Sequence, residues 1–312
     1  MKSAFLTMPV AIAAALVPGH AGATPLTSDL LTDFNAIVGN FSSTSETEGA
    51  VIVGGTLSGS SATFDTRGGH PSGTVSGFGD VNVYGDTSGG PYNVNNLAVK
   101  VATAKQTATF SGGSVTYSAS LPYSYASISG QLTKLSTTLS TLKTTTGSSL
   151  SNSVFTAKPV NGVAVLDLTL SQLQNIGNPS FKLNGAQLFI INVDASSYAT
   201  VSGQNFNDQG IAANILWNFY NAKSLNFGVE FGGTVLAPGA HVTNSSPIDG
   251  TLFAASYTGN GELHVAPLSD ASYLNTVQGV PEPSTWMMLI VGFAGAGVMG
   301  WRGRGRVAAR AA

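Results

Sequence analysis

Short apolar segments that begin at or near a glycine recur along the chain, and they constrain the fold more than any other feature. The segment at 49–57 reads Gly-Ala-Val-Ile-Val-Gly-Gly-Thr-Leu, and related segments lie at 232–240 and 248–256. The last two begin roughly one coil's length apart, as expected when each coil of a solenoid lays a short strand beside the one before. The repeat predicts a mainly β protein with a β-solenoid (β-helix) body. A β-sandwich made of the same strands is the alternative.

Further short strands are expected where apolar residues alternate between turn residues. They lie at 50–58, 81–86, 97–101 and 114–117. Asn161-Gly162 and Asn184-Gly185 are typical of tight hairpin turns, so we expect hairpin insertions in the middle of the body. The nearly continuous apolar run 188–193 predicts a fully buried strand.

One long helix is expected to flank the solenoid. Apolar residues recur at helical spacing along one face, at Ile128, Leu132, Leu135, Leu139 and Leu142. The other positions are mostly Ser and Thr, which form helices only moderately well. Such a helix depends on packing, so we expect it to dock on the β body and to end at Gly147. A coiled-coil seam for a partner is the less favoured interpretation.

The composition limits the possible functions. Charged residues make up 9% of the chain and cysteine is absent. Disulfides, thiolate nucleophiles and thiolate metal ligands are therefore excluded. Several of the basic residues lie at the two ends of the chain, which leaves the body with a net negative charge. Such a body argues against nucleic acid as a partner, because nucleic-acid binding needs a basic patch.

The N-terminus is typical of a secretory signal peptide. Lys2 precedes an apolar run from 4 to 17, and Ala21-Gly22-Ala23 is a small-x-small cleavage site. We expect residues 1–23 to be a signal helix that signal peptidase removes after Ala23. Residues 24–279 would then form one β-rich domain.

The C-terminus has three parts in a fixed order. The motif Pro281-Glu282-Pro283-Ser284 precedes an apolar stretch, 285–301, and a tail, 302–312, that carries Arg302, Arg304 and Arg306. The stretch is close to the roughly 20 residues of a membrane-spanning helix, and arginines beside a span stay on the cytoplasmic side. We expect a transmembrane helix at 285–301, with the body across the membrane from the tail.

Residues 280–312 resemble the PEP-CTERM sorting signal of Gram-negative bacteria, in the motif, the apolar stretch and the arginine cluster. The resemblance implies export through the inner membrane, transient insertion there, and processing at residues 281–284 by an exosortase-type sorting peptidase. The destination would be the cell surface or the extracellular matrix. Whether the anchor is cleaved or retained stays open.

The body resembles the choice-of-anchor A domain at its opening and its close. Asp33-Phe34-Asn35-Ala36-Ile37-Val38 carries the opening, and Gly250-Thr251-Leu252-Phe253-Ala254 is among the segments that carry the close. Gly233-Thr234-Val235-Leu236-Ala237-Pro238, after a Trp-Asn-Phe strand, is also similar to ice-binding-protein-like β-solenoids that have a helix alongside. These resemblances imply an adhesive or matrix role and bring no catalytic motif.

Candidate chemical groups are few. His70, His241 and His264 are dispersed, and Glu262 would share a strand face with His264 as a hydrogen-bonded pair or as half of a metal site, the pair being favoured.

Two acidic pairs and an aromatic group complete the candidates. Glu46 with Glu48, and Asp80 with Asp86, are compatible with Ca²⁺ but more typical of solvated side chains and Asx turns. Trp217, Phe219 and Tyr220 are expected in the core rather than on a sugar platform. No catalytic, cofactor-binding or metal-ligating residue is assigned.

The sequence favours a non-enzymatic surface protein that acts in adhesion or in the exopolysaccharide and biofilm matrix. A low-charge face of Ser, Thr and Asn would contact exopolysaccharide or cell-surface glycans through many weak hydrogen bonds. One alternative is a polysaccharide-active enzyme on a β-helix, which needs two carboxylates in a deep groove. The other is an ice-binding-like protein, which needs ranks of Thr on a flat face, and the imperfect repeat argues against it.

Overall fold

The computed structural model describes residues 27–64, 67, 70–196, 199–201, 206 and 209–274. The expected signal peptide, with Ala21 and Ala23, lies outside these residues. So does the expected sorting signal, with residues 281–284, the span 285–301 and the arginines at 302, 304 and 306. Within the described ranges, no helix is both long enough and apolar enough to cross a membrane.

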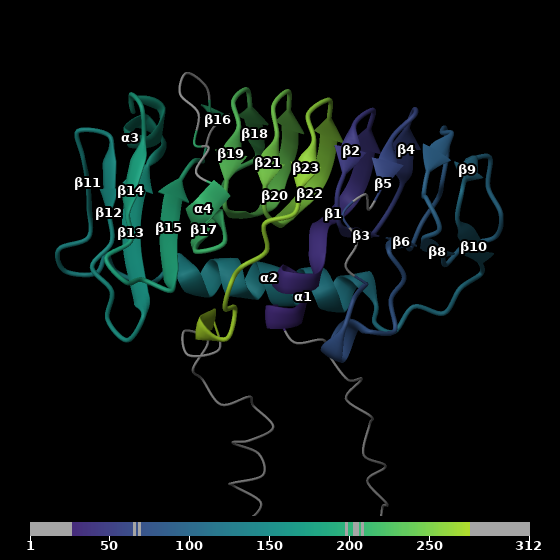
Figure 1. The fold of residues 1–312 in the computed structure, drawn as a ribbon, viewed down its shortest axis with the longest axis horizontal. Helices are drawn as coiled ribbons and strands as arrows, with labels where there is room; N and C mark the ends of the chain where they lie inside the picture. Colours follow the sequence, from purple (N-terminus) through teal and green to yellow (C-terminus); the bar gives the residue numbers. More distant parts are fainter. Residues whose placement is uncertain are drawn as a thin grey trace, which may run out of the picture.

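The body is a parallel β-solenoid, as the repeat predicts (Figure 1). Neighbouring coils pair strand to strand in the same direction, which excludes the antiparallel sandwich. Each complete coil contributes up to three strands, and the stacked strands make three walls.

The first wall is covered by α2 (Tyr125–Leu139), and we call it the helix wall. It consists of the first halves of three long strands and of seven shorter strands. The long strands are β1 (Phe34–Ser43), β20 (Thr234–Asn244) and β22 (Leu252–Gly259), and the shorter ones are β3 (Ala50–Val53), β6 (Val81–Val83), β8 (Ala98–Val101), β10 (Ser114–Tyr117), β13 (Val163–Thr169), β15 (Leu188–Asp194) and β17 (Ile215–Asn218).

The second wall, which we call the open wall, continues from the second halves of β1, β20 and β22. It also contains β4 (Leu57–Gly59), β16 (Ala199–Val201) and β18 (Ser224–Phe227). The third wall consists of two-residue strands: β2 (Glu46–Thr47), β5 (Thr63–Phe64), β7 (Tyr92–Asn93), β9 (Phe110–Ser111), β19 (Phe231–Gly232), β21 (Ile248–Asp249) and β23 (Leu263–His264).

The coils do not stack in the order of the sequence. Along the helix wall the strands follow the order β10-β8-β6-β3-β1-β22-β20-β17-β15-β13. The first coil therefore lies in the middle, the next coils extend to one end, and α2 returns the chain past them to the other end (Figure 1). From there the later coils come back until β22 pairs with β1, with Ala36 opposite Leu252 and Ser43 opposite Gly259.

Most strands of the helix wall are buried on both faces, whereas the end strand β10 is partly exposed on both. Alternate residues such as Val51 and Val53 point into the solenoid, whereas Ile52 packs with Ile128 and Leu132 of α2. Because both environments are apolar, the sequences of these strands are nearly continuous apolar runs and do not alternate between apolar and polar residues. Residues 188–193 are all buried, as expected.

Helix α2 packs along the solenoid as predicted but ends earlier. Ser124 caps its N-terminus by accepting a hydrogen bond from the Ser127 amide. The expected end at Gly147 is wrong, because the helix stops at Leu139. There, side chains of the helix wall take the final carbonyls: Asn192 Nδ2 donates to Leu139 O at 2.8 Å, and Asn218 Nδ2 donates to Ser136 O at 2.9 Å.

The Asn-Gly turns form, but the hairpins expected at them do not. Asn161 and Gly162 have positive φ values, and the turn makes one antiparallel bridge, between Val160 and Val163. After each turn the chain joins the parallel stack instead, as β13 and β15. Burial between helix and solenoid outweighs local hairpin pairing. A hairpin does occur in this section, between β11 (Ser149–Ser151) and β12 (Val154–Thr156), and β14 (Ser180–Lys182) extends it in parallel.

Four short helices complete the described fold. They are α1 (Thr27–Asp33), η1 (Gly73–Val75), α3 (Leu170–Gln174) and α4 (Gln209–Ala212). Leu30 and Leu31 of α1 pack with Leu268, Ala271 and Leu274 on the helix-covered side. The first and last described segments of the chain therefore lie beside each other.

Candidate functional site

The open wall carries a straight rank of small polar side chains. Six residues occupy aligned positions on neighbouring strands, in the order Thr200, Asn226, Thr243, Thr258, Ser42 and Ser58. Neighbouring parallel strands lie about 4.8 Å apart, so the rank repeats at that spacing across six strands. These side chains are half-buried or exposed, and none is charged.

A second rank runs beside the first. Ser224, His241, Ser256 and Asn40 are aligned on four of the same strands. His241 Nδ1 lies 2.8 Å from Ser256 Oγ, and Thr243 Oγ1 donates to Asn226 Oδ1 at 2.9 Å. These bonds between strands fix the side chains in place. Neither rank contains an acidic residue.

The inner side of the open wall is a single apolar row. Leu225, Val242, Tyr257, Phe41 and Leu57 occupy one aligned row that points into the solenoid, and each is at most 1% exposed. Strict alternation then places the polar ranks outward. The ranks could not be predicted from the sequence, because their members come from separate segments and are of different residue types.

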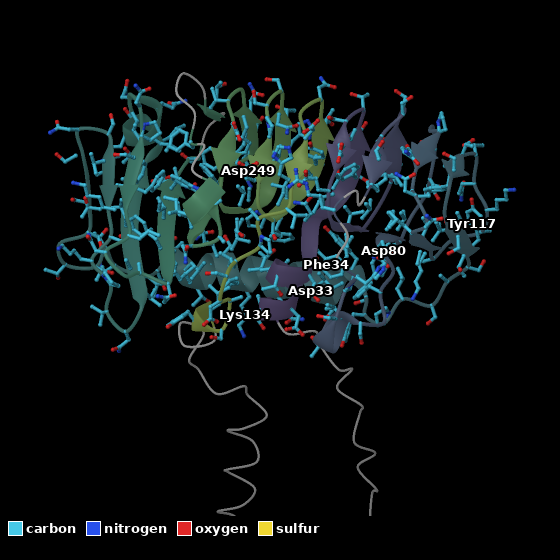
Figure 2. The ribbon with its side chains drawn as sticks, viewed as in Figure 1. Asp33, Phe34, Asp80, Tyr117, Lys134 and Asp249 are labelled. Atoms are coloured by element: carbon cyan, nitrogen blue, oxygen red, sulfur yellow. The ribbon has the colours of Figure 1, made fainter. Side chains whose placement is uncertain are left out.

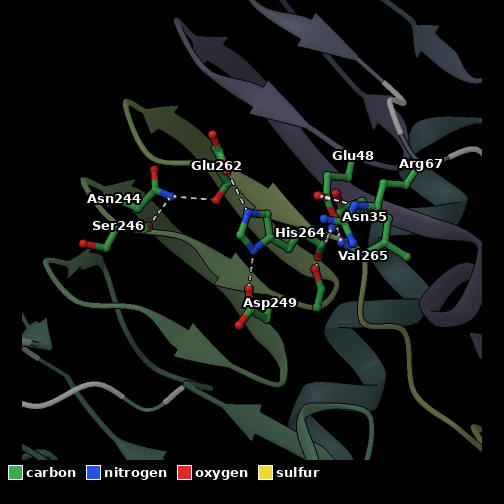
Figure 3. Close-up of polar contacts among 10 residues, drawn as sticks. Asn35, Glu48, Arg67, Asn244, Ser246, Asp249, Glu262, His264 and Val265 are labelled. Carbon is green, nitrogen blue, oxygen red and sulfur yellow. Dashed lines mark hydrogen bonds and ion pairs between the residues drawn. The ribbon is translucent and has the colours of Figure 1, made fainter. Parts of the chain in front are cut away.

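The third wall holds a cluster of acidic residues around one histidine, shown in Figure 3. His264 Nδ1 lies 2.7 Å from Asp249 Oδ1, and His264 Nε2 lies 2.8 Å from Glu262 Oε2. The predicted Glu262–His264 pair therefore forms, and Asp249 joins it from the neighbouring coil. Burial acts to lower the pKa of His264, but the bonds to Glu262 and Asp249, with the charges of Glu48 and Asp249, raise that pKa above its usual value.

Glu48 lies beside this cluster and is not solvated, contrary to expectation. Its side chain is 5% exposed, and Oε1 lies 2.8 Å from Arg67 Nε. Oε2 accepts a hydrogen bond of 2.9 Å from the Val265 amide. Val265 is 217 positions away in sequence, so no local pattern reveals this partner. Glu46, on β2 two residues before Glu48, is half-buried.

Asp80 and Asp86, which were compatible with Ca²⁺ but more typical of Asx turns, bind separate partners. Asp80 is buried on the N-terminal coils, whereas Asp249 lies on the C-terminal coils (Figure 2). Asp80 Oδ1 lies 2.5 Å from His70 Nδ1, and Oδ2 accepts from the Ala98 amide at 2.7 Å. Asp86 instead accepts from Gln106 Nε2 at 3.3 Å. The local Asx turn expected at Asp80 is replaced by bonds to other coils.

A hollow of about 250 Å³ lies near the C-terminal end of α2. Asp167, Asp194 and Tyr220 line it, with Asn192 and Gln172. Burial and the charges of Asp194 and Asp167 raise the pKa of Tyr220. Both carboxylates are engaged, because Asp167 Oδ2 accepts from the Thr144 amide at 2.9 Å and Asp194 Oδ1 accepts from Asn221 Nδ2 at 2.6 Å.

The aromatic cluster is core, as expected for two of its three members. Trp217 and Phe219 are fully buried, and Trp217 Nε1 donates to Gly232 O at 2.9 Å. Tyr220 is half-buried at the hollow. The cluster therefore supplies no sugar platform.

The chain matches two known protein families. Residues 27–265 match the family described as "Putative Ice-binding-like adhesive domain", in accord with the resemblance to choice-of-anchor A domains and ice-binding-like solenoids. Residues 279–306 match the PEP-CTERM protein-sorting motif, which implies recognition by exosortase-type machinery and export to the surface of a Gram-negative cell. No curated protein and no solved structure matches the chain. The first match covers most of the sequence, and the chain belongs to the family of ice-binding-like adhesive domains.

Proposed function

We propose that the protein is a non-enzymatic adhesin that binds polyhydroxylated polymers, such as exopolysaccharide or surface glycans, through its open wall. The observation that carries this proposal is the rank of Thr200, Asn226, Thr243, Thr258, Ser42 and Ser58 across six paired strands. Hydroxyl and amide groups both donate and accept hydrogen bonds, as sugar hydroxyls do.

The strength of such binding comes from repetition. A single hydrogen bond contributes only about 0.5–1.5 kcal/mol net, but a fixed rank offers several to one extended chain. The bonds between Thr243 and Asn226 and between His241 and Ser256 hold the side chains before binding, which lowers the entropy cost of association. Display of many copies on a cell would add avidity.

The test replaces the centre of the rank. In a strain that lacks the gene, wild-type protein and the double variant Thr243→Lys/Thr258→Lys are produced, and surface attachment and retention of the cell's own exopolysaccharide are measured. We expect the variant to retain at least about tenfold less polymer, because the loss of two hydrogen bonds amounts to roughly 1.4 kcal/mol or more. Thr133→Lys, on the exposed face of α2, is the control for added charge. Unchanged retention in the double variant would refute the proposal.

Ice binding is a second candidate that the same rank favours. The structure aligns Thr200, Thr243 and Thr258 more regularly than the imperfect sequence repeat suggests. Thermal hysteresis of the wild-type protein and of the double variant distinguishes the two functions. Activity that is lost with the two threonines would favour ice, whereas polymer retention without thermal hysteresis favours adhesion.

The hollow near α2 is the feature that favours a polysaccharide-active enzyme. It brings Asp167 and Asp194 to one depression, yet Thr144, Asn192 and Asn221 already bind these carboxylates. We therefore assign Asp167 and Asp194 to the structure of the coils. Release of reducing sugar from exopolysaccharide by wild-type protein, and its loss in Asp194→Asn, would reverse this assignment.

A further inference from the structure

The acidic cluster on the third wall contains a fourth residue that the hydrogen bonds of His264 leave unexplained. Glu230, Asp249 and His264 each offer a ligand atom, and these atoms all lie within 4.8 Å of one another. The arrangement follows from the coil register, because β19, β21 and β23 pair in parallel and place Asp249 opposite His264. Glu230 directly precedes β19. Three successive coils thus deliver one potential ligand each.

Asp249 supplies the observation that points to a bound ion. Its side chain is 1% exposed. Oδ1 takes the bond from His264 Nδ1, but Oδ2 is buried and has no hydrogen-bond partner among the described residues. A buried charged oxygen without a partner costs more than the roughly 1–3 kcal/mol of a neutral group. Such an atom is stabilised when a cation binds it.

The charge of the cluster supports the same conclusion. Glu230, Asp249 and Glu262 surround one imidazole, and Glu48 lies close enough to act on His264. A doubly hydrogen-bonded imidazolium accounts for Asp249 Oδ1 and for Glu262. It leaves Asp249 Oδ2 without a partner among the described residues. Like charges held this close are unfavourable, and a cation between them relieves the repulsion, as a proton on one of them also does.

We propose that Glu230, Asp249 and His264 bind one divalent transition-metal ion of the Zn²⁺ type. An imidazole nitrogen with carboxylate oxygens suits Zn²⁺, whereas Ca²⁺ takes six to eight oxygen ligands. Zn–N and Zn–O bonds of about 2.0–2.2 Å place tetrahedral ligand atoms roughly 3.4 Å apart. Atoms already within 4.8 Å of one another reach that spacing through small side-chain rotations. Glu262 bonds the other ring nitrogen of His264 and would orient the imidazole, so a water completes the shell.

The position of the site gives the ion a structural role that is independent of polymer binding. Strand β23 pairs with β21 on one side and with β2 of the first coil on the other. An ion bound by Glu230, Asp249 and His264 would fasten the last three coils together next to the place where they close onto the N-terminal coils. Because the unfolded chain lacks such a site, the ion would raise the melting temperature.

The experiment uses the full-length protein, stripped with a chelator and dialysed. Zn²⁺ affinity is measured by competition with a chromogenic chelator, and Co²⁺ is added separately to read its absorption in the visible region. We expect one ion per chain, a higher melting temperature with Zn²⁺, and at least about tenfold weaker binding in Asp249→Asn and His264→Gln. His241→Gln is the matched control, because His241 lies on the open wall beside Ser256, and it should bind as wild type does.

A second measurement needs no variant and covers the case in which a substitution unfolds the chain. Diethylpyrocarbonate modifies accessible imidazoles, and the His264 side chain is 21% exposed. Zn²⁺ should protect His264 in the wild-type protein and leave His241 equally modified, as read by peptide mass spectrometry. Failure of Zn²⁺ to bind, binding of Ca²⁺ instead, or equal modification of His264 with and without Zn²⁺ would overturn the proposal.

Discussion

The side chain of Asn35 hydrogen-bonds the backbone beside Gly250, at the corner between the third wall and the helix wall. Asn35 Nδ2 donates to Gly250 O at 2.7 Å and to His264 O at 3.0 Å, and Asn35 Oδ1 accepts from the Gly49 amide at 3.2 Å. In other coils the backbone passes through this corner from one coil to the next, as from β21 to β22. Between β23 and β1 there is no such connection, because β23 is the last strand and β1 follows α1. This side-chain amide therefore adds to the pairing of β22 with β1 in joining the two halves of the solenoid.

Loss of this amide should destabilise the whole domain. Asn35 is 4% exposed, and Asn35→Ala removes three hydrogen bonds at a buried corner. We expect the free energy of unfolding to fall by about 2–4 kcal/mol, measured by urea denaturation. Asn226→Ala, on the open wall, should change it by less than about 0.5 kcal/mol. Equal effects of the two substitutions would contradict the role assigned to Asn35.

The polar contact between α2 and the helix wall gives a second prediction. Ser136 Oγ donates to Asn218 Oδ1 at 2.5 Å, and both residues are fully buried. Ser136→Ala leaves that oxygen without its donor, so we expect a loss of about 1–3 kcal/mol in the free energy of unfolding. Ser129→Ala, which is partly exposed on the same helix, serves as the comparison and should be close to neutral. A neutral Ser136→Ala would show that water replaces the hydroxyl.

Two glycines should respond to alanine in opposite directions. A Cβ at Gly54 would lie 2.2 Å from Tyr125 Cδ1, whereas a Cβ at Gly130, within α2, meets no atom within 4 Å. Gly54→Ala must displace Tyr125 at the start of α2 and should cost about 1–3 kcal/mol. Gly130→Ala should stabilise the protein by about 0.5–1 kcal/mol, because alanine favours the helix. Thermal melts of both variants check the two signs.

Buried tyrosines predict unfolding at high pH. Burial raises the pKa of Tyr92 to about 12, and the pKa values of Tyr84, Tyr125 and Tyr257 shift in the same direction. The unfolded chain ionises first, near its usual pKa of about 10. Stability is therefore complete below about pH 10 and falls as the pH rises toward about 12, by roughly 2–3 kcal/mol for Tyr92 alone.

Urea midpoints measured across this pH range, together with tyrosinate absorbance, test the prediction. Tyr92→Phe should reduce the slope without abolishing it, because the other tyrosines still titrate. A midpoint that stays constant from about pH 9 to about pH 12 would show that these hydroxyls ionise equally in both states.

The sequence predicted the local features of the fold well. The glycine-led repeats indicated stacked parallel strands, the spacing from Ile128 to Leu139 indicated the flanking helix, and the run 188–193 indicated a strand buried on both faces. Each of these signals lies within one segment. They failed at Asn161-Gly162 and Asn184-Gly185, where the turn geometry was right but the pairing of the arms depended on neighbouring coils.

The order of the coils and the candidate sites could not be predicted in this way. A repeat indicates that strands stack, but it does not say that β22 lies against β1. The burial of Glu48 depends on Arg67 and Val265, and Asp249 meets His264 only through the register of β21 with β23. The open-wall rank likewise combines serine, threonine and asparagine from distant segments. Residues that come together only through strand register cannot be recognised from the pattern of any one segment.

The meeting of the two described chain ends has a geometric consequence for display. Leu31 near the start and Leu274 at the end pack in the cluster that faces α2, so both described ends lie on the helix-covered side. A tether attached at Leu274 would hold the solenoid at the middle of its long axis rather than at one end. Attachment at that point would let the long axis lie along the surface to which the tether is fixed, so that several coils of the open wall could meet one extended polymer together.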